Sequence, residues 1–316
     1  MEAIATRDAY GQALVELGEQ NRDLVVLDAD LAMATKTVAF KQRFPDRFFD
    51  MGIAEQNMIG TAAGLALSGK VPFASSFAVF ATGRAFEQIR NSVAYPGVNV
   101  KIAATHAGIT VGEDGASHQS VADISLMRSL PNMTVLVPAD GVETVQAVRA
   151  AAAFQGPVYI RLGRLKVPVI FGDDHHFSIG PAYVLRQGSD AAVLSCGIMV
   201  SKALEAGRQL AAEGIEIAVV NVPTIKPLDG DRLVEIARQT GAVVTAEEHS
   251  VIGGLGSAAA ELLSQRYPVP LEMVGIRDCF GESGSPDQLL AKYGLTEIDI
   301  INAVKKAMVR KRDARV

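Results

Sequence analysis

The sequence predicts an α/β fold made of two units, each built around a largely parallel β-sheet. Short apolar runs of strand length alternate with helical stretches over positions 1–168, and the alternation starts again over 190–316. This alternation is typical of parallel sheets covered by helices. Positions 169–189 contain Gly172 and Pro181 and show no clear period, so we predict a linker between the units.

In the first unit, apolar and β-branched runs mark the predicted strands, which are 24–28, 47–51, 71–75, 98–103, 134–137 and 157–161. Helical patterns lie between them, at about 6–20, after Glu55, at 84–95 and at 140–153. The run Leu24-Val-Val-Leu-Asp28 is continuously apolar up to its last residue, as expected for a strand that is buried on both faces.

In the second, smaller unit the predicted strands are 191–195, 215–222, 242–246 and 271–275. Helices are expected up to about 213, from about 230, and after the glycine-rich stretch 253–256. That stretch lacks the GxGxxG spacing and the lysine of phosphate-binding loops, so we interpret it as a tight turn between a strand and a helix.

The composition argues against several kinds of partner. The chain of 316 residues has a formal net charge of −5, which gives no reason to expect nucleic acid or an anionic membrane as a partner. No apolar run approaches the roughly 18 residues needed to cross a bilayer, and no signal-peptide pattern begins the sequence. Cys196 and Cys279 lack CxxC spacing and are expected to be buried, reduced thiols, which predicts a cytoplasmic protein. The basic stretch 305–315 is expected to be a solvated helix end.

Several polar and aromatic residues directly follow predicted strands. Asp28 and Asp30 follow the first strand, Glu55 the second, 75–80 the third and His106 the fourth. Ligands of open α/β sheets bind at the carboxyl ends of the strands. The sequence therefore predicts one site at this edge of the sheet.

Two interpretations apply to Glu55. An acidic residue in the first turn of a helix is most often there to interact with the helix dipole. Small neighbours such as Gly52, Gly60 and Gly64 instead leave room for another molecule to approach. A carboxylate in such a close-packed place would have its protonated form favoured by desolvation, as acid–base chemistry requires.

His106 and His118 flank Glu113 and Asp114 in a glycine-rich loop. Their spacing fits neither a zinc site nor an EF-hand, so we predict no metal there. His118 could simply cap a helix that begins near Ser120, but histidines in such a loop suit hydrogen bonding to a polar substrate or proton transfer. The linker histidines at 175 and 176 are expected to be solvated.

Phe77 and Phe80 have a similar pair of interpretations. Most phenylalanines pack in a core. In the stretch 75–80, at the end of a strand, they could instead stack on a planar heterocycle.

Taken together, these residues resemble the thiamine-diphosphate enzymes of the transketolase family. The resemblance covers about 5–310 and is to the second half of those enzymes, a pyrimidine-binding domain followed by a C-terminal domain. It is carried by Phe49-Asp-Met-Gly-Ile-Ala-Glu-Gln56, by 75–80, by His106 and by Gly112-Glu-Asp-Gly-Ala-Ser-His-Gln119. It implies that the first unit binds the pyrimidine ring of thiamine diphosphate.

The resemblance also implies a role for each residue of the cofactor site. Glu55 matches the acid that hydrogen-bonds the aminopyrimidine and promotes its proton-abstracting tautomer. Phe80 and Phe77 match the aromatic wall around that ring. Asp30 matches an acid that lines the cofactor pocket. Gly83 departs from the family, which usually has an aromatic residue there.

For the substrate, His106, Asp114 and His118 match residues that contact sugar hydroxyls and the donor's carbonyl oxygen, so the resemblance implies catalytic roles for both histidines. Arg7 and Arg164 match arginines that grip the terminal phosphate of sugar phosphates. Ala34 replaces a phosphate-contacting serine, which is a second departure.

The resemblance further implies a partner. In the family, the diphosphate and its Mg²⁺ are held by a Gly-Asp-Gly motif followed by Asn. In this sequence Asp-Gly occurs at 114–115, 140–141 and 229–230, and Gly never precedes it. We therefore expect an N-terminal transketolase subunit to supply that site, in an assembly with two copies of each subunit.

The implied reaction is transfer of a two-carbon ketol unit between ketose and aldose phosphates. A 1-deoxyxylulose-5-phosphate synthase and the E1 β chain of a 2-oxo-acid dehydrogenase stay open as alternatives, because Ala54-Glu-Gln56 does not discriminate among the three enzymes. The loop from His106 to His118 favours transketolase. A non-catalytic scaffold with the same fold is a further alternative, against which the joint presence of Glu55 and this loop argues.

Overall fold

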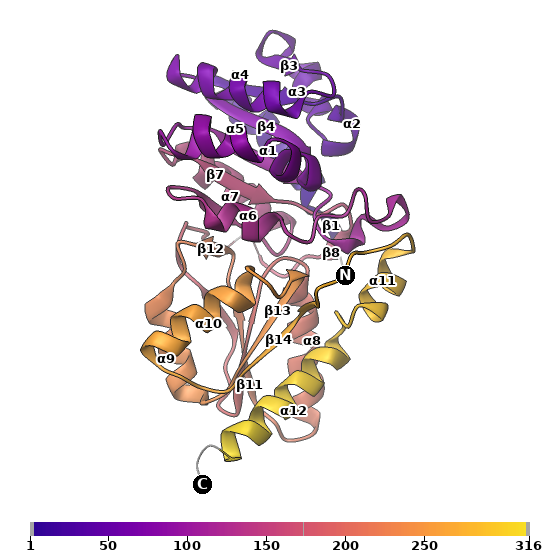
Figure 1. Ribbon diagram of the computed structural model, residues 1–316, viewed down its shortest axis with the longest axis vertical. Helices are drawn as coiled ribbons and strands as arrows, with labels where there is room; N and C mark the ends of the chain where they lie inside the picture. The colour runs from indigo at the N-terminus through magenta and orange to yellow at the C-terminus, as the bar shows by residue number, and fades with distance from the viewer. Residues whose placement is uncertain (1–2, 173, 314–316) are drawn as a thin grey trace.

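The computed structural model describes residues 3–172 and 174–313 and contains two α/β units stacked end to end (Figure 1). The first unit, indigo to magenta in Figure 1, lies above the second, which runs from pink to yellow. The predicted fold class, an α/β unit with a largely parallel sheet followed by a smaller α/β unit, agrees with this architecture.

The first unit is built on a seven-stranded sheet in which only one edge strand is antiparallel to its neighbour. In spatial order the strands are β12 (Thr224–Lys226), β6 (Thr134–Leu136), β7 (Val158–Arg161), β5 (Lys101–Thr105), β4 (Val71–Phe77), β2 (Leu24–Asp28) and β3 (Phe48–Asp50). All of β2, β5 and β7 is buried, which explains why the interior of each run is apolar rather than alternating.

Both faces of this sheet are covered. Because side chains alternate along a strand, Val25 and Leu27 of β2 pack in one core cluster and Leu24 and Val26 in another. The first cluster includes residues of α4 (Glu55–Leu67) and α6 (Asp123–Ser129), and the second includes residues of α1 (Thr6–Gln20) and α7 (Gly141–Ala153). The shorter helices of this unit are α2 (Ala32–Thr35), α3 (Val38–Arg43), η1 (Pro45–Arg47) and η4 (Ile109–Asp114).

The segment predicted as one helix over 84–95 is less regular than expected. It begins with η2 (Phe80–Arg84), continues through α5 (Phe86–Gln88) and ends with η3 (Ile89–Ala94), and both η2 and η3 are π-type helices. Wide π-type turns are rare and occur frequently at functional sites.

The second unit has a five-stranded sheet, ordered β14 (Leu271–Ile276), β13 (Val243–Ser250), β10 (Ala191–Ser195), β11 (Ile217–Asn221) and β9 (Tyr183–Arg186). Only β9 runs antiparallel to its neighbour. The helices are α8 (Met199–Ala212), α9 (Gly230–Thr240), α10 (Leu255–Arg266), α11 (Pro286–Lys292) and α12 (Glu297–Asp313). At the glycine-rich turn, the Glu247 carboxylate accepts hydrogen bonds from the N–H groups of Leu255 and Gly256, so an internal acid already occupies the start of α10.

The chain between the units is more structured than a linker. Within 169–189, β9 belongs to the second sheet, whereas β12, from the second half of the sequence, pairs with β6 of the first. Just before it, β8 (Lys166–Pro168) pairs with β1 (Ala3–Ala5).

Two expectations about polar side chains were wrong. The His175 side chain is largely buried, stacks on Phe171 with ring centroids 3.8 Å apart and lies 3.4 Å from the buried Glu143 carboxylate. A buried carboxylate needs partners, and the imidazole is one of them. Cys196 is buried as expected, but Cys279 is exposed on a loop of the second unit.

A fully buried charged network joins the two units. Arg161, at the end of β7, donates from Nε to Asp123 Oδ2 (2.8 Å) and from Nη2 to the Glu248 carbonyl oxygen (2.8 Å). Tyr159 donates its hydroxyl to the same Asp123 oxygen (2.7 Å). The pKa of the Asp123 carboxyl is lowered despite its burial, because Arg161 and His249 lie nearby. Since Glu248 lies in β13, this network fixes the second unit against the first.

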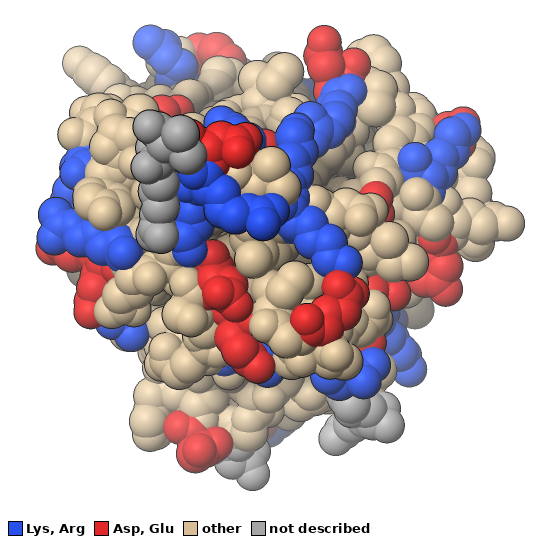
Figure 2. Space-filling view, turned by 90° about the horizontal axis from the view of Figure 1, so that it is seen from below, with Lys and Arg blue, Asp and Glu red and all other residues tan. Residues whose placement is uncertain are grey.

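Three basic residues of the stretch predicted at 305–315 are paired with acids, and positions 314 and 315 of that stretch lie outside the described residues. Lys306 and Arg310 both bind Glu272, and Lys305 binds Glu213. Figure 2, which views the molecule from below, shows Lys and Arg side chains interleaved with acidic ones on this face. In the part of the chain that the structure describes, no helix combines the length and apolar character needed to cross a membrane.

Replacing Arg161 with Met should lower the free energy of unfolding by about 3–5 kcal/mol, because it leaves the buried Asp123 carboxylate without its counter-ion. Urea denaturation measures this loss. As a control, Arg310→Met removes a half-exposed arginine from Glu272, which keeps Lys306 as a counter-ion, and should cost about 1 kcal/mol or less. Equal losses of unfolding free energy in the two variants would show that the buried pair contributes no more to stability than the pair at Arg310.

Candidate active site

The strands that precede the predicted site residues are neighbours in the first sheet. The spatial order β5, β4, β2, β3 places the residues after these strands side by side at one edge. His106 follows β5, Phe80 follows β4 in the chain, and Glu55 starts the helix after β3. The site predicted at the carboxyl ends of the strands is therefore one continuous region.

An aromatic cluster forms the centre of this region. The Phe77 ring stacks on Phe80 (centroids 5.9 Å apart, planes 11° apart) and on His106 (3.7 Å, 20°). His118 meets Phe80 edge-on at 5.4 Å. The two phenylalanines and two histidines predicted from separate motifs thus lie in one group.

His106 is a neutral histidine whose protonated nitrogen can be assigned. Its Nε2 lies 3.2 Å from Arg7 Nη1, and since a guanidinium can only donate, Nε2 must be the acceptor. The proton therefore sits on Nδ1, which is 2.9 Å from Thr105 Oγ1. Burial, followed by the charges of Arg7, Arg164, His118 and Lys36, lowers the pKa of His106 to about 3.

Three cations surround this side of the cluster. Arg7 also donates to the Ala34 carbonyl oxygen (3.1 Å). Arg164 Nη1 donates to the Val111 carbonyl oxygen (2.6 Å) and lies 3.6 Å from Asp114 Oδ2. Lys36, which sequence reasoning missed, is held 3.3 Å from Asp8. Guanidinium groups and an ammonium arranged in this way suit a phosphate or another oxyanion.

On the other side of the cluster, Glu55 is buried and engaged by an arginine that sequence reasoning also missed. Arg84 Nη1 lies 2.8 Å from both Glu55 carboxylate oxygens, and its guanidinium carbon lies 4.7 Å from the Phe80 ring centre. Directly before this arginine is Gly83, where the resembled family usually has an aromatic residue.

Asp30 occupies the turn after β2 but lies toward solvent. Its backbone has a left-handed φ of 61°, and its N–H donates to Asp50 Oδ1 (3.1 Å). The buried acid of this turn is Asp28, whose carboxylate accepts hydrogen bonds from Thr35 and Thr37 and whose pKa burial raises to about 6.

The loop between the two histidines is held from the second unit. Thr110 N–H donates to Glu248 Oε1 (2.8 Å), and a Cβ added to Gly108 would lie 2.2 Å from that carboxylate. The Gln119 amide donates to the carbonyl oxygens of Gly112 (3.2 Å) and Glu282 (2.8 Å). The position of Asp114 and His118 therefore depends on contacts from the second unit.

The sheet edge suits a heterocyclic ring better than a metal ion. Glu55 offers a buried carboxylate and Phe80 an aromatic face, and apart from the adjoining backbone and chain neighbours no described atom lies within 4 Å of where a Cβ on Gly52 or Gly83 would be. The buried Ser76 hydroxyl also has no hydrogen-bond partner among the described residues. Within 3–172 and 174–313, His, Cys, Asp and Glu side chains nowhere form a group of three or more that could hold a metal ion.

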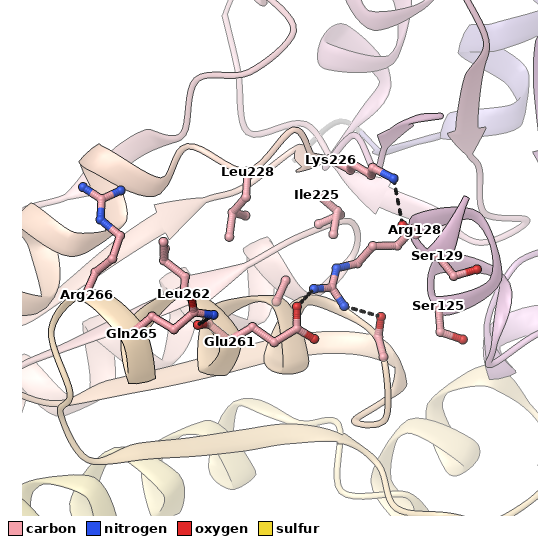
Figure 3. Close-up of a pocket in the computed structure, with 12 residues that line it drawn as sticks. Ser125, Arg128, Ser129, Ile225, Lys226, Leu228, Glu261, Leu262, Gln265 and Arg266 are labelled. Carbon is pink, nitrogen blue, oxygen red and sulfur yellow. Dashed lines mark hydrogen bonds and ion pairs between the residues drawn. The ribbon is translucent and has the colours of Figure 1, made fainter. Parts of the chain in front are cut away.

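A hollow of about 620 Å³ lies elsewhere, between α6 and β12 on one side and α10 on the other. Figure 3 shows Arg128 and Glu261 pointing toward each other there, and Lys226 Nζ donates to the carbonyl oxygens of Arg128 and Leu130. Arg266, at the rim, pairs with Asp231. The described residues that line this hollow include no aromatic ring and no histidine, so the sheet edge, which groups both beside a buried acid, is the stronger candidate site.

Comparison with known proteins shows the family to which the chain belongs. Family models described as "Transketolase, pyrimidine binding domain" and "Transketolase, C-terminal domain" match residues 2–169 and 180–300. The chain belongs to the transketolase family, a family that depends on thiamine diphosphate, and the resemblance found in the sequence is confirmed.

Its relatives include separate C-terminal chains. It is 49% identical over 305 residues to the "Putative transketolase C-terminal section" of Methanocaldococcus jannaschii, with 96% of each chain covered. It is 48% identical over 305 residues to the "6-deoxy-6-sulfo-D-fructose transketolase subunit SqwH" of Clostridium sp. strain MSTE9, covering 96% of this chain and 95% of that one. Rattus norvegicus "Transketolase" is 37% identical, but the match covers only 49% of its length.

Solved structures similar to this chain likewise include a split-gene chain that it matches in full and a longer transketolase that it matches over about half. A chain described as "Split gene transketolase, inactive beta4 tetramer" is 60% identical with a TM-score of 0.92, covering 98% of this chain and all of that one (100%). Transketolase from Campylobacter jejuni is 25% identical with a TM-score of 0.83, covering 96% of this chain and 47% of that one.

The buried, neutral His106 should make the protein less stable in acid. The folded chain binds this proton more weakly than the unfolded chain, whose histidine has a pKa of 6.5, so stability is lost as the pH falls below that value. Between about pH 7.5 and about pH 5 this loss is about 2 kcal/mol. His106→Gln should remove that part of the pH dependence, measured by urea denaturation at both pH values. The exposed His176→Gln should keep the wild-type dependence, and an unchanged slope in His106→Gln would contradict the assignment.

Glu248→Gln should loosen the loop without unfolding the chain, because it removes the negative charge that holds Thr110 N–H. Hydrogen exchange at the Thr110 amide should become faster by about tenfold or more, since hydrogen bonds to charged groups contribute about 1.5–3 kcal/mol. The matched control is Glu247→Gln, a neighbouring buried acid that binds the start of α10 instead. It should speed exchange at Leu255 and Gly256 only. Unchanged exchange at Thr110 in Glu248→Gln would refute the role of Glu248.

Proposed function

We propose that this chain is the C-terminal subunit of a two-chain transketolase, which transfers a two-carbon ketol unit between ketose phosphates and aldose phosphates. The observation that carries the proposal is the convergence at one sheet edge of a buried acid, an aromatic wall and a histidine beside three cations. Family membership supports the cofactor, and the relatives described as sections or subunits support the division into two chains.

In this proposal the acid and the aromatic residues form the cofactor side of the site. When bound, thiamine diphosphate supplies a nucleophilic carbon for attack on the carbonyl of a ketose. Glu55 would hold and exchange a proton at the aminopyrimidine ring, and its burial strengthens that hydrogen bond. Phe77 and Phe80 would orient the ring by stacking. Asp30 would line the outer wall of the pocket.

The histidines and cations form the substrate side. His106, neutral and with Nε2 as an acceptor, would bind a sugar hydroxyl, and it would need Arg7 to shift before taking up a proton. His118 would be the proton-transferring histidine near the reacting carbonyl. Asp114 would bind a second hydroxyl, and Arg7 and Arg164 would hold the terminal phosphate with Lys36 adding charge.

An N-terminal subunit would complete the site. It would carry the Gly-Asp-Gly motif, followed by Asn, that binds Mg²⁺ and the diphosphate, in an assembly with two copies of each subunit. Support comes from the sequence, which lacks that motif, and from the match to about half of rat transketolase. The reduced cysteines expected from the sequence fit a cytoplasmic location for this complex.

The donor sugar is the open part of the proposal. The cations at Arg7, Arg164 and Lys36 can bind any terminal oxyanion, and one relative is described as acting on 6-deoxy-6-sulfo-D-fructose. We favour a donor sugar with a terminal phosphate. Comparing ketol transfer from a phosphate donor and from a sulfonate donor tests this choice directly.

The reaction is tested by combining this chain with a transketolase N-terminal subunit, thiamine diphosphate and Mg²⁺, and measuring ketol transfer. Xylulose 5-phosphate should act as donor, with 6-deoxy-6-sulfofructose and pyruvate as competing alternatives. Glu55→Gln should lower kcat by about 100-fold or more, the scale of acid–base contributions, whereas Arg90→Ala, an exposed arginine of η3, should leave it unchanged.

Three results would count against parts of this proposal. Full activity in Glu55→Gln would exclude the proposed acid. Activity without any N-terminal subunit would exclude the two-chain site. Consumption of pyruvate in place of a ketose would favour the synthase or dehydrogenase alternative.

A further inference from the structure

We propose that Arg84 sets the affinity of the cofactor site by competing with the pyrimidine ring for Glu55 and for the face of Phe80. This inference rests on the proposed function, because it concerns the same two residues that would hold the ring. It goes further in assigning a role to a residue that neither the motifs nor the resemblance singled out.

The first contact is with the carboxylate. A single Arg84 nitrogen, Nη1, donates to both Glu55 oxygens at 2.8 Å. Only 1% of the Glu55 side chain is exposed, whereas 48% of the Arg84 side chain is, so the guanidinium covers the acid from the solvent side. The guanidinium occupies one lone-pair direction on each oxygen, so a ring nitrogen that approaches from the solvent side would have to displace it.

The second contact is with the aromatic wall. The guanidinium carbon lies 4.7 Å from the centre of the Phe80 ring, which also stacks on Phe77 and meets His118 edge-on. A guanidinium is planar and delocalised, stacks on aromatic faces and presents N–H donors at its edge. An aminopyrimidine is likewise a flat nitrogen-containing group with donors at its edge. Arg84 therefore makes, within one side chain, the two kinds of contact that the ring would make.

The local backbone explains why Arg84 can serve both residues. Phe80 and Arg84 are four residues apart at the two ends of the π-type helix η2, whose wide turn brings them over one another. The Arg84 carbonyl oxygen accepts a hydrogen bond from the Gln56 side chain at 3.2 Å, which ties this turn to the start of α4. With the backbone held, the long side chain can swing into solvent without refolding of the segment.

The exchange of partners is energetically reasonable. A buried carboxylate left without a partner is costly, so Arg84 stabilises Glu55 while no ring is present. A bound ring restores both the hydrogen bond and the stacking contact, and the half-exposed arginine regains hydration. The ring must displace the Arg84 side chain before it binds. The free energy of the contacts that Arg84 makes with Glu55 and Phe80 is therefore subtracted from the binding free energy of the ring.

The experiment uses a probe that needs only the residues of this chain. Binding of 4-amino-5-hydroxymethyl-2-methylpyrimidine, the ring without its diphosphate, is measured by calorimetry for the wild type, Arg84→Ala and Arg84→Lys. Binding of thiamine diphosphate with Mg²⁺ to the two-chain complex is measured in parallel. Arg84→Ala should bind both probes at least about tenfold more tightly, a difference of about 1.4 kcal/mol. Arg84→Lys, which keeps a charge but not the planar group, should lie between.

Controls separate this effect from a general change of charge or fold. Arg90→Ala removes an exposed arginine from the neighbouring η3, bonded to Asn91 and not to Glu55, and should bind like the wild type. In the double variant Glu55→Gln, Arg84→Ala, the gain should disappear, because the group being competed for is gone. Unfolding curves confirm that each variant is folded.

The inference is overturned if the Arg84→Ala complex binds thiamine diphosphate no more tightly than the wild-type complex does. This measurement also decides the outcome if the pyrimidine fragment binds to none of the variants. This failure is distinct from failure of the proposed function. If Glu55→Gln abolishes ketol transfer but Arg84→Ala leaves affinity unchanged, only the competition is refuted. If Glu55→Gln remains active, the function proposed for the site is refuted whatever Arg84 does.

Discussion

The buried pair of Arg161 and Asp123 is the interaction on which most of this structure depends. Arg161 ends β7 of the first sheet, bonds Asp123 at the start of α6 and reaches the backbone of Glu248 in the second unit. A charge this deeply buried is tolerated only when it is fully paired, so the elements that supply its partners cannot move independently. The loop between the two histidines also depends on this network, because the Glu248 carboxylate accepts a hydrogen bond from the Thr110 N–H in that loop.

The candidate site is divided into two electrostatic halves that meet at the aromatic cluster. On one side a buried acid faces an arginine, and on the other a neutral histidine faces three cations. Phe77 touches both halves, through Phe80 and through His106. An uncharged ring and an anionic sugar could thus be held next to each other without sharing the same charged groups.

The sequence was sufficient for features that depend on local pattern, and insufficient for those that depend on distant partners. The apolar runs that became β2 and β10 have the bounds expected, and the parallel direction of the strands at the site follows from the βα alternation, although their spatial order does not. The strand expected at 98–103 lies at 101–105, because apolar residues also precede it in the loop. The three residues of β12 form a strand only because β6 offers a free edge.

In the candidate site, too, the sequence predicted residues that lie in local motifs but not those whose partners are distant in the chain. Residues such as Glu55, Phe77 and His106 were selected because they lie at or after the ends of predicted strands and in the motifs that resemble the transketolase family. Arg84 is 29 residues from Glu55 in the sequence, and Glu248 is 138 from Thr110, so no local pattern connects either pair. Their partners are set by how the sheets stack, which single-sequence periodicity does not contain.

The strand β12 also limits how freely the two units can be recombined. A chimeric chain cut at the linker would take 1–168 from one parent and leave the edge of its first sheet to three residues, 224–226, from the other. The foreign half would also have to present a carboxylate beside Gly108, where the existing contact leaves no room for a Cβ. The two units are therefore separate in architecture but not interchangeable as modules, and grafts between relatives should be designed with residues 224–226 and Glu248 counted as part of the first unit.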